Sequence, residues 1–140
     1  MHVLDTDTLT LLHFGHQHVT QRMTQIASDD LAITSITQIE ALRGRYERLM
    51  KATTVDQLVG AQVRLNQTER FLRDFIVLPV TRPTAEMFER LGKDRKARNI
   101  GHADLLIASI VLVNNAVLVT RNLRDFRKVP NLRLENWIDD

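Results

Sequence analysis

Short apolar runs alternate with longer segments of helical periodicity along this 140-residue chain. The expected strands are Val3–Leu4, 31–34, 76–80, 116–120 and 132–134, and the expected helices are 7–14, 19–27, 35–50, 55–75, 84–99 and 103–114. Strands that alternate with helices favour a mostly parallel sheet with helices on both faces. We therefore expect an α/β fold built on a sheet of about four to five strands.

Two of the helical segments have distinctive apolar patterns. Segment 35–50 places apolar side chains on one face, at Ile36, Ile39, Leu42, Tyr46 and Leu49. Segment 103–114 is apolar almost all round, so we expect a buried helix that Asn114 and Asn115 end.

The length fits one domain, which we place at residues 1–140. The chain contains no cysteine, which excludes disulfides and thiolate chemistry and suits a reducing cytosol. No stretch approaches the roughly 18 apolar residues of a membrane span, and the N-terminus lacks the basic start of a signal peptide. We expect a cytoplasmic protein without a membrane partner. Its net charge of +2 is compatible with binding nucleic acid.

Three acidic residues fall where a parallel sheet would gather them. Asp5 follows the first strand, Glu40 lies about one turn into segment 35–50, and Asp104 begins the most apolar helix. Ligands bind outside the carboxyl ends of parallel strands, so these carboxylates are expected to converge. Three nearby carboxylates repel each other. A bound Mg²⁺ or Mn²⁺ ion removes that repulsion, because it neutralises the charges and prefers the oxygen ligands that carboxylates supply.

Each acid also has a structural interpretation. Asp5, Thr6 and Asp7 are good helix caps, and Asp104 suits the first turn of a helix. Glu40 lies at capping-box spacing from Thr37, as does Gln38 from Ser35. Taken singly, each acid fits a cap better than a ligand. Their joint placement favours a shared site.

Other polar groups suggest less specific chemistry. The five histidines, at positions 2, 13, 16, 18 and 102, lack zinc-site spacing, so we interpret them as surface or structural residues. Basic residues form three clusters, at Arg43, Arg45 and Arg48, at 90–98, and at 121–128. Basic side chains around a metal-binding pocket would suit the negatively charged phosphates of an RNA backbone. Asp5 and Asp7 also have the two-residue spacing of haloacid-dehalogenase-like phosphatases, but Leu9 stands where that motif wants Thr or Val.

Four segments together resemble the PIN-domain family, specifically the VapC-type toxin ribonucleases of toxin–antitoxin pairs. They are VLDTDTL, ITSITQIEALRGR, IGHADLLIAS, and VLVTRNLRDF with the following PNLRLENW. Their order and spacing extend the resemblance over the whole chain. It implies a PIN-like three-layer sandwich.

The resemblance also implies roles for particular residues. Asp5, Glu40 and Asp104 would be the catalytic acids, with Asp5 and Asp104 holding Mg²⁺ or Mn²⁺. Thr6, Asp7, Thr120, Asn122 and Asp125 would support them. Asp7 stands where the family commonly has Asn. Asn122 stands where many members have a fourth acid, which leaves open whether Asn122 or Asp125 fills that position.

The activity implied is endonucleolytic hydrolysis of RNA, often of tRNA or another structured RNA. A small antitoxin that blocks the site and a homodimer are implied partners. Segments 35–50 and 55–75, with their apolar faces, are the expected partner groove. The alternative is a catalytically silent PIN-like module that binds RNA or serves as a scaffold, which the uncharged Asn122 favours.

Overall fold

A computed structural model describes residues 1–139 of the protein, so position 140 of the expected domain lies outside the described residues. Its described strands form one five-stranded sheet in the order β3-β2-β1-β4-β5, and every neighbouring pair is parallel. The strands are β1 His2–Leu4, β2 Leu31–Thr34, β3 Ile76–Leu78, β4 Val117–Val119 and β5 Arg133–Glu135. The expected α/β fold is confirmed, and the last strand, β5, lies at an edge of the sheet.

The helices follow the predicted segments with a few differences. The α-helices are α1 Thr6–His13, α2 Gln17–Met23, α3 Ser35–Lys51, α4 Val55–Leu72, α5 Arg82–Gly92, α6 His102–Val113 and α7 Leu123–Phe126, and the 3₁₀ turns are η1 Ser28–Asp30 and η2 Ala97–Asn99. The short helix α7 was not predicted.

The predicted helix 55–75 ends slightly earlier, at Leu72, and two other predicted helices extend further past their observed ends. In the segment predicted as 19–27, the helix ends at Met23. The backbone N–H groups of Gln25 and Ile26 donate to carbonyl oxygens three residues earlier, which forms a turn in place of further α-helix. The segment predicted as 84–99 ends at Gly92. There the Asp94 carboxylate accepts the backbone N–H groups of Lys96 and Ala97, both at 2.9 Å, and so starts a separate turn.

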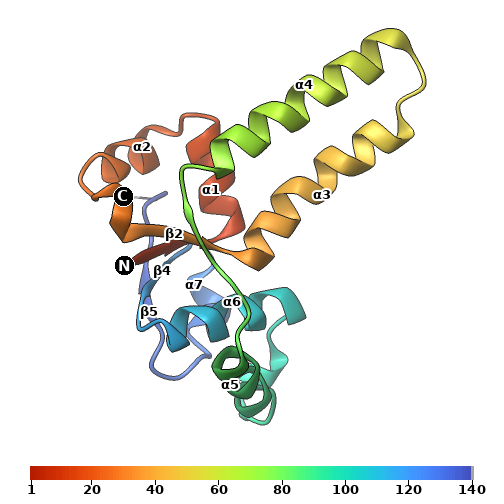
Figure 1. The fold of residues 1–140 in the computed structure, drawn as a ribbon. Coiled ribbons are helices and arrows are strands. Elements are labelled where there is room, and N and C mark those ends of the chain that lie inside the picture. Colours follow the sequence, from red (N-terminus) through yellow and green to blue (C-terminus); the bar gives the residue numbers. More distant parts are fainter. Residues whose placement is uncertain (140) are drawn as a thin grey trace.

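The core lies on both faces of the sheet, as the predicted three-layer sandwich requires. Val3 and Leu118 pack with the buried side chains of α5 and α6. Their chain neighbours Leu4 and Val119 point to the opposite face, where they pack with α1, α2 and Trp137. Figure 1 shows α5 and α6 on one side of the strands and α1 and α2 on the other. Helix α6 is buried as predicted, with Ile110 and Val111 fully covered.

Helices α3 and α4 form a long antiparallel hairpin that extends away from the sheet (Figure 1). Two of the apolar side chains predicted to share one face of α3, Ile39 and Tyr46, are 50% and 47% exposed. Within residues 1–139, no helix combines the length and the apolarity needed to cross a bilayer.

Candidate active site

Asp5 and Thr120 meet at the point where the order of the strands in the sheet reverses. From β1 the chain builds outward through β2 and β3, and it then crosses back to β4 on the other side of β1. Asp5 follows β1 and Thr120 follows β4. The Thr120 hydroxyl donates a hydrogen bond of 2.6 Å to Asp5 Oδ2. Such a switch point is where parallel α/β sheets bind ligands.

The carboxylate of Asp5 has two structural partners. Besides Thr120, the backbone N–H of Thr8 donates to Oδ1 at 2.9 Å, which makes Asp5 the N-cap of α1. The side chain is only 7% exposed. Burial raises the pKa of Asp5, while its hydrogen bonds oppose that shift. The capping interpretation is therefore confirmed, and the cap is also a buried carboxylate at the switch point.

Glu40 is held by threonines rather than by a helix cap. The Thr6 hydroxyl donates to Glu40 Oε1 at 2.7 Å and lies 3.2 Å from the hydroxyl of Thr37. The N-cap of α3 is Thr34, whose hydroxyl accepts the N–H of Thr37 at 3.1 Å. The capping-box interpretation of Glu40 is therefore wrong, because its carboxylate turns to α1. Sequence reasoning missed Thr34 and Thr37, although two hydroxyls at capping spacing after a strand were a usable signal.

Asp104 lies in the first turn of α6, as predicted, and is partly buried. Burial raises the pKa of Asp104, and the negative charges of Glu40, Asp5, Asp125 and Asp7, in decreasing order, raise it further. Acids from three separate parts of the chain thus act on the Asp104 carboxyl group. Within residues 1–139, no basic side chain forms an ion pair with Asp5, Asp7, Glu40 or Asp104.

The raised pKa values of Asp5 and Asp104 predict a pH dependence. A carboxyl whose pKa is higher in the folded state binds its proton more tightly there, so folding is favoured as pH falls through that pKa. We therefore expect the melting temperature in EDTA to rise as the pH falls from 7 toward the ordinary pKa of aspartate. Below about pH 4, protonation of Asp94 and Asp125, whose pKa values are lowered, reverses the trend.

Differential scanning fluorimetry across this range checks the prediction. Asp104→Asn should flatten the rise, because its amide does not titrate. A melting temperature that falls steadily from pH 7 to pH 5 in the wild type would contradict the expectation.

In the last motif, Asp125 supplies the negative charge and Asn122 supplies hydrogen bonds. Asn122 caps α7 and donates from Nδ2 to Asp125 Oδ2 at 3.1 Å, while its backbone N–H donates to Thr120 Oγ1 at 2.9 Å. The Asn122 hydrogen bond and the nearby Lys128 lower the pKa of Asp125 and keep it charged. The bond from Asn122 to Thr120 links this motif to Asp5.

The donors suit a hard divalent cation, although they are not arranged as its ligands. Within residues 1–139, no three His, Asp or Glu side chains already stand in a metal-binding cluster. Asp5 is turned to Thr8 and Thr120, and Glu40 is turned to Thr6. Gathered carboxylates without a paired cation are nevertheless the donor set that Mg²⁺ or Mn²⁺ prefers.

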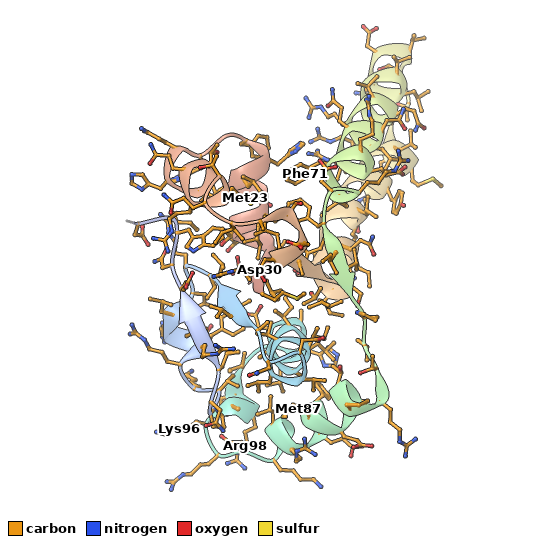
Figure 2. The ribbon with its side chains drawn as sticks, turned by 60° about the vertical axis from the view of Figure 1, so that its left-hand side comes forward. Met23, Asp30, Phe71, Met87, Lys96 and Arg98 are labelled. Carbon is orange, nitrogen blue, oxygen red and sulfur yellow. The ribbon has the colours of Figure 1, made fainter. Side chains whose placement is uncertain are left out.

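Three of the histidines make structural contacts, as interpreted. His16 caps α2, His18 Nδ1 lies 3.0 Å from the carbonyl of Ile138, and His102 packs on Phe88. Lys96 and Arg98 lie at the end of the molecule opposite the α3–α4 hairpin (Figure 2).

A family model described as the PIN domain matches residues 2–132. The chain belongs to the PIN-domain family. The resemblance inferred from the motifs is therefore confirmed, and the alternative of a dehalogenase-like phosphatase is set aside.

Relatives place this PIN domain close to VapC proteins. It is 26% identical to the tRNA(fMet)-specific endonuclease VapC of Salmonella typhimurium over 96% of both chains. A shorter stretch of 48 residues is 52% identical to ribonuclease VapC2 of Rickettsia felis, over 34% of this chain and 36% of that protein. The crystal structure of VapBC2 from Rickettsia felis, bound to a promoter DNA fragment, has a TM-score of 0.76 at 25% identity, over 97% of this chain and 98% of that one.

Proposed function

We propose that this PIN-domain protein is a divalent-metal-dependent endoribonuclease of the VapC toxin type. The observation that carries the proposal is that, besides burial, the charges of Glu40 and Asp5 raise the pKa of Asp104, while no basic side chain within residues 1–139 forms an ion pair with any of these three acids. The ribonuclease names of its relatives support the same reaction.

In this proposal, Asp5 and Asp104 hold Mg²⁺ or Mn²⁺, and Glu40 binds the ion or orients the attacking water. The bound ion supplies activation of water and stabilisation of the charge that develops on the phosphodiester. Thr120 fixes the orientation of the Asp5 carboxylate, and Thr6 fixes that of Glu40. Asp125 adds negative charge near Asp104, while Asp7 lies in the first turn of α1 and supports its start.

Thr6→Val is expected to lower the cleavage rate by about 10- to 100-fold, the usual cost of losing a residue that orients a ligand. The valine keeps the shape of threonine but cannot donate to Glu40. The rate of cleavage at saturating Mg²⁺ measures the effect, and Thr20→Val, at an exposed threonine of α2, is the control. Equal rates for Thr6→Val and wild type would show that Glu40 needs no such support.

The partners follow from the same assignment. We propose RNA, and tRNA in particular, as the substrate class, consistent with the tRNA(fMet) specificity of the Salmonella relative. We further propose a small antitoxin partner, which the VapBC complex supports. A homodimer is part of the same proposal. The exposed apolar side chains of the hairpin, among them Met50, Val55 and Val59, suit such a protein partner.

The test is incubation of purified protein with tRNA in Mg²⁺ and in EDTA. Cleavage that needs Mg²⁺ and disappears in Asp104→Ala supports the proposal, whereas equal cleavage by Asp104→Ala refutes the metal site. The alternative of a silent RNA-binding module, which the uncharged Asn122 favours, predicts that the wild type binds RNA without cutting it. Asp7→Ala should keep most activity, because Asp7 is exposed at the start of α1.

A further inference from the structure

We propose that the groove between α1 and the α3–α4 hairpin binds one unpaired nucleotide of the RNA substrate, an inference that rests on the proposed RNA cleavage. The groove has a volume of about 310 Å³, and its walls come from α1, α3 and α4. Thr6 and Glu40 belong to its lining, so the groove adjoins the proposed catalytic carboxylates. A nucleotide held there would be a near neighbour of the scissile phosphate.

Aromatic rings line the groove from two helices. Phe14, at the end of α1, is 72% exposed although it is a large apolar side chain. The ring centroid of His13 lies 5.7 Å from that of Phe14 and 4.4 Å from that of Phe71. Figure 2 shows Phe71 on the side of α4 that faces α1. Exposed aromatic faces are the surfaces on which unpaired RNA bases stack.

Two arginines of α3 line the same groove. Arg45 donates from Nε to the hydroxyl of Thr68 at 3.1 Å, which fixes its side chain across the α3–α4 hairpin. Arg48 lies one turn further along α3. Glu40 is the only acid among the described lining residues, and it stands next to Thr6. Stacking surfaces beside guanidinium groups match a nucleotide, which combines a flat base with an anionic phosphate.

The size of the groove decides between paired and unpaired RNA. Its volume is at the lower end of the roughly 300–1,000 Å³ typical of small-ligand pockets, which suits a single nucleotide. A paired base stays stacked within its duplex and cannot enter. We therefore infer that cleavage occurs beside an unpaired nucleotide, in a loop, a bulge or a single strand.

The first test measures binding in EDTA, where the RNA remains intact. The probes are a short fluorescein-labelled RNA strand and the same strand annealed to its complement. Phe14→Ala should weaken binding of the single strand by at least about fivefold, the lower bound for losing one stacked base, and leave binding of the duplex unchanged. The control Met50→Ala removes an 83% exposed apolar side chain outside the groove and should behave as the wild type.

The second test locates the base and the phosphate. Abasic substitutions are made along the single strand, and one position should weaken binding to the wild type but cause no further loss in Phe14→Ala. Arg48→Ala should reduce the salt dependence of binding by about 0.7 in the logarithmic slope, one phosphate contact, whereas Arg82→Ala should not. Arg82 is an exposed arginine of α5 that pairs with Glu86 and is the matched control.

Failure of the groove and failure of the nuclease proposal give different results. If Phe14→Ala binds single strands as tightly as the wild type while the wild type cleaves RNA in Mg²⁺, the groove assignment is overturned and the nuclease stands. The same result is expected if the groove binds a protein segment instead of RNA. If Asp104→Ala cleaves as well as the wild type, the proposed active site fails whatever the binding data show.

Discussion

Asp104→Asn should reduce RNA cleavage at least about 100-fold, more than the loss expected for a residue that only orients a metal ligand. The asparagine has the shape of aspartate and suits the first turn of α6, but its neutral amide is a poor ligand for Mg²⁺. The same variant should be at least as stable as the wild type in EDTA. The wild-type carboxylate is partly buried and faces the charges of Glu40 and Asp5, which raise its pKa and oppose its ionisation.

Activity and stability, measured together, show whether Asp104 is a metal ligand or a structural residue. The measurements are cleavage rate in Mg²⁺ and melting temperature in EDTA, at pH 7. Added Mg²⁺ should raise the melting temperature of the wild type by mass action, and that rise should shrink in Asp104→Asn. Asp56→Asn, an exposed first-turn acid of α4, is the matched control and should keep both activity and the response to Mg²⁺. A variant that loses activity only because it unfolds would argue against this assignment.

Asp5→Ala should lose both activity and stability. The substitution removes the N-cap of α1, which costs about 0.5–2 kcal/mol. It also leaves the buried hydroxyl of Thr120 without its acceptor, which costs about 1–3 kcal/mol. Relief of the unfavourable burial of the Asp5 charge offsets part of this loss. We expect a melting temperature several degrees below that of the wild type, with no RNA cleavage.

Asp5→Asn separates the two roles of this residue. Asparagine is a good N-cap, because its Oδ1 can accept the N–H of Thr8, and its Nδ2 can donate to the Thr120 hydroxyl in place of the oxygen that accepted from it. Its melting temperature should therefore stay near that of the wild type, while RNA cleavage should still be lost because a metal ligand has lost its charge. Urea denaturation and a cleavage assay on the same preparation compare the two variants. Full cleavage by Asp5→Asn would mean that Asp5 is a cap and not a ligand.

The sequence predicted the helical and strand segments well, because the apolar pattern of a segment depends mainly on which of its sides pack against the core. The alternation of Val3 and Leu4 between two faces of the sheet and the apolar surroundings of α6 are of this kind. Helix ends were less predictable. The end of α5 at Gly92 depends on side-chain bonds from Asp94 that compete with continuing the helix.

The same reasoning explains why the pair of Asp5 and Asp7 was misleading. Their spacing suggests two carboxylates that act together, yet Asp5 is a buried cap and Asp7 is exposed on the first turn of α1. The position of Asp5 at the end of a strand was the informative feature. It is what connects Asp5 with Glu40 and Asp104, far along the chain.

The amino-acid sequence by itself determined the α/β class, the rim on which the acids gather and the resemblance to the PIN-domain family, because periodicity and residue order carry that information. Only the tertiary structure decided which hydroxyl holds which carboxylate. The strand order places β4 beside β1 and so brings Thr120 to Asp5, and the packing of α1 on α3 brings Thr6 to Glu40. Contacts between distant segments depend on that order and packing, which no local pattern encodes.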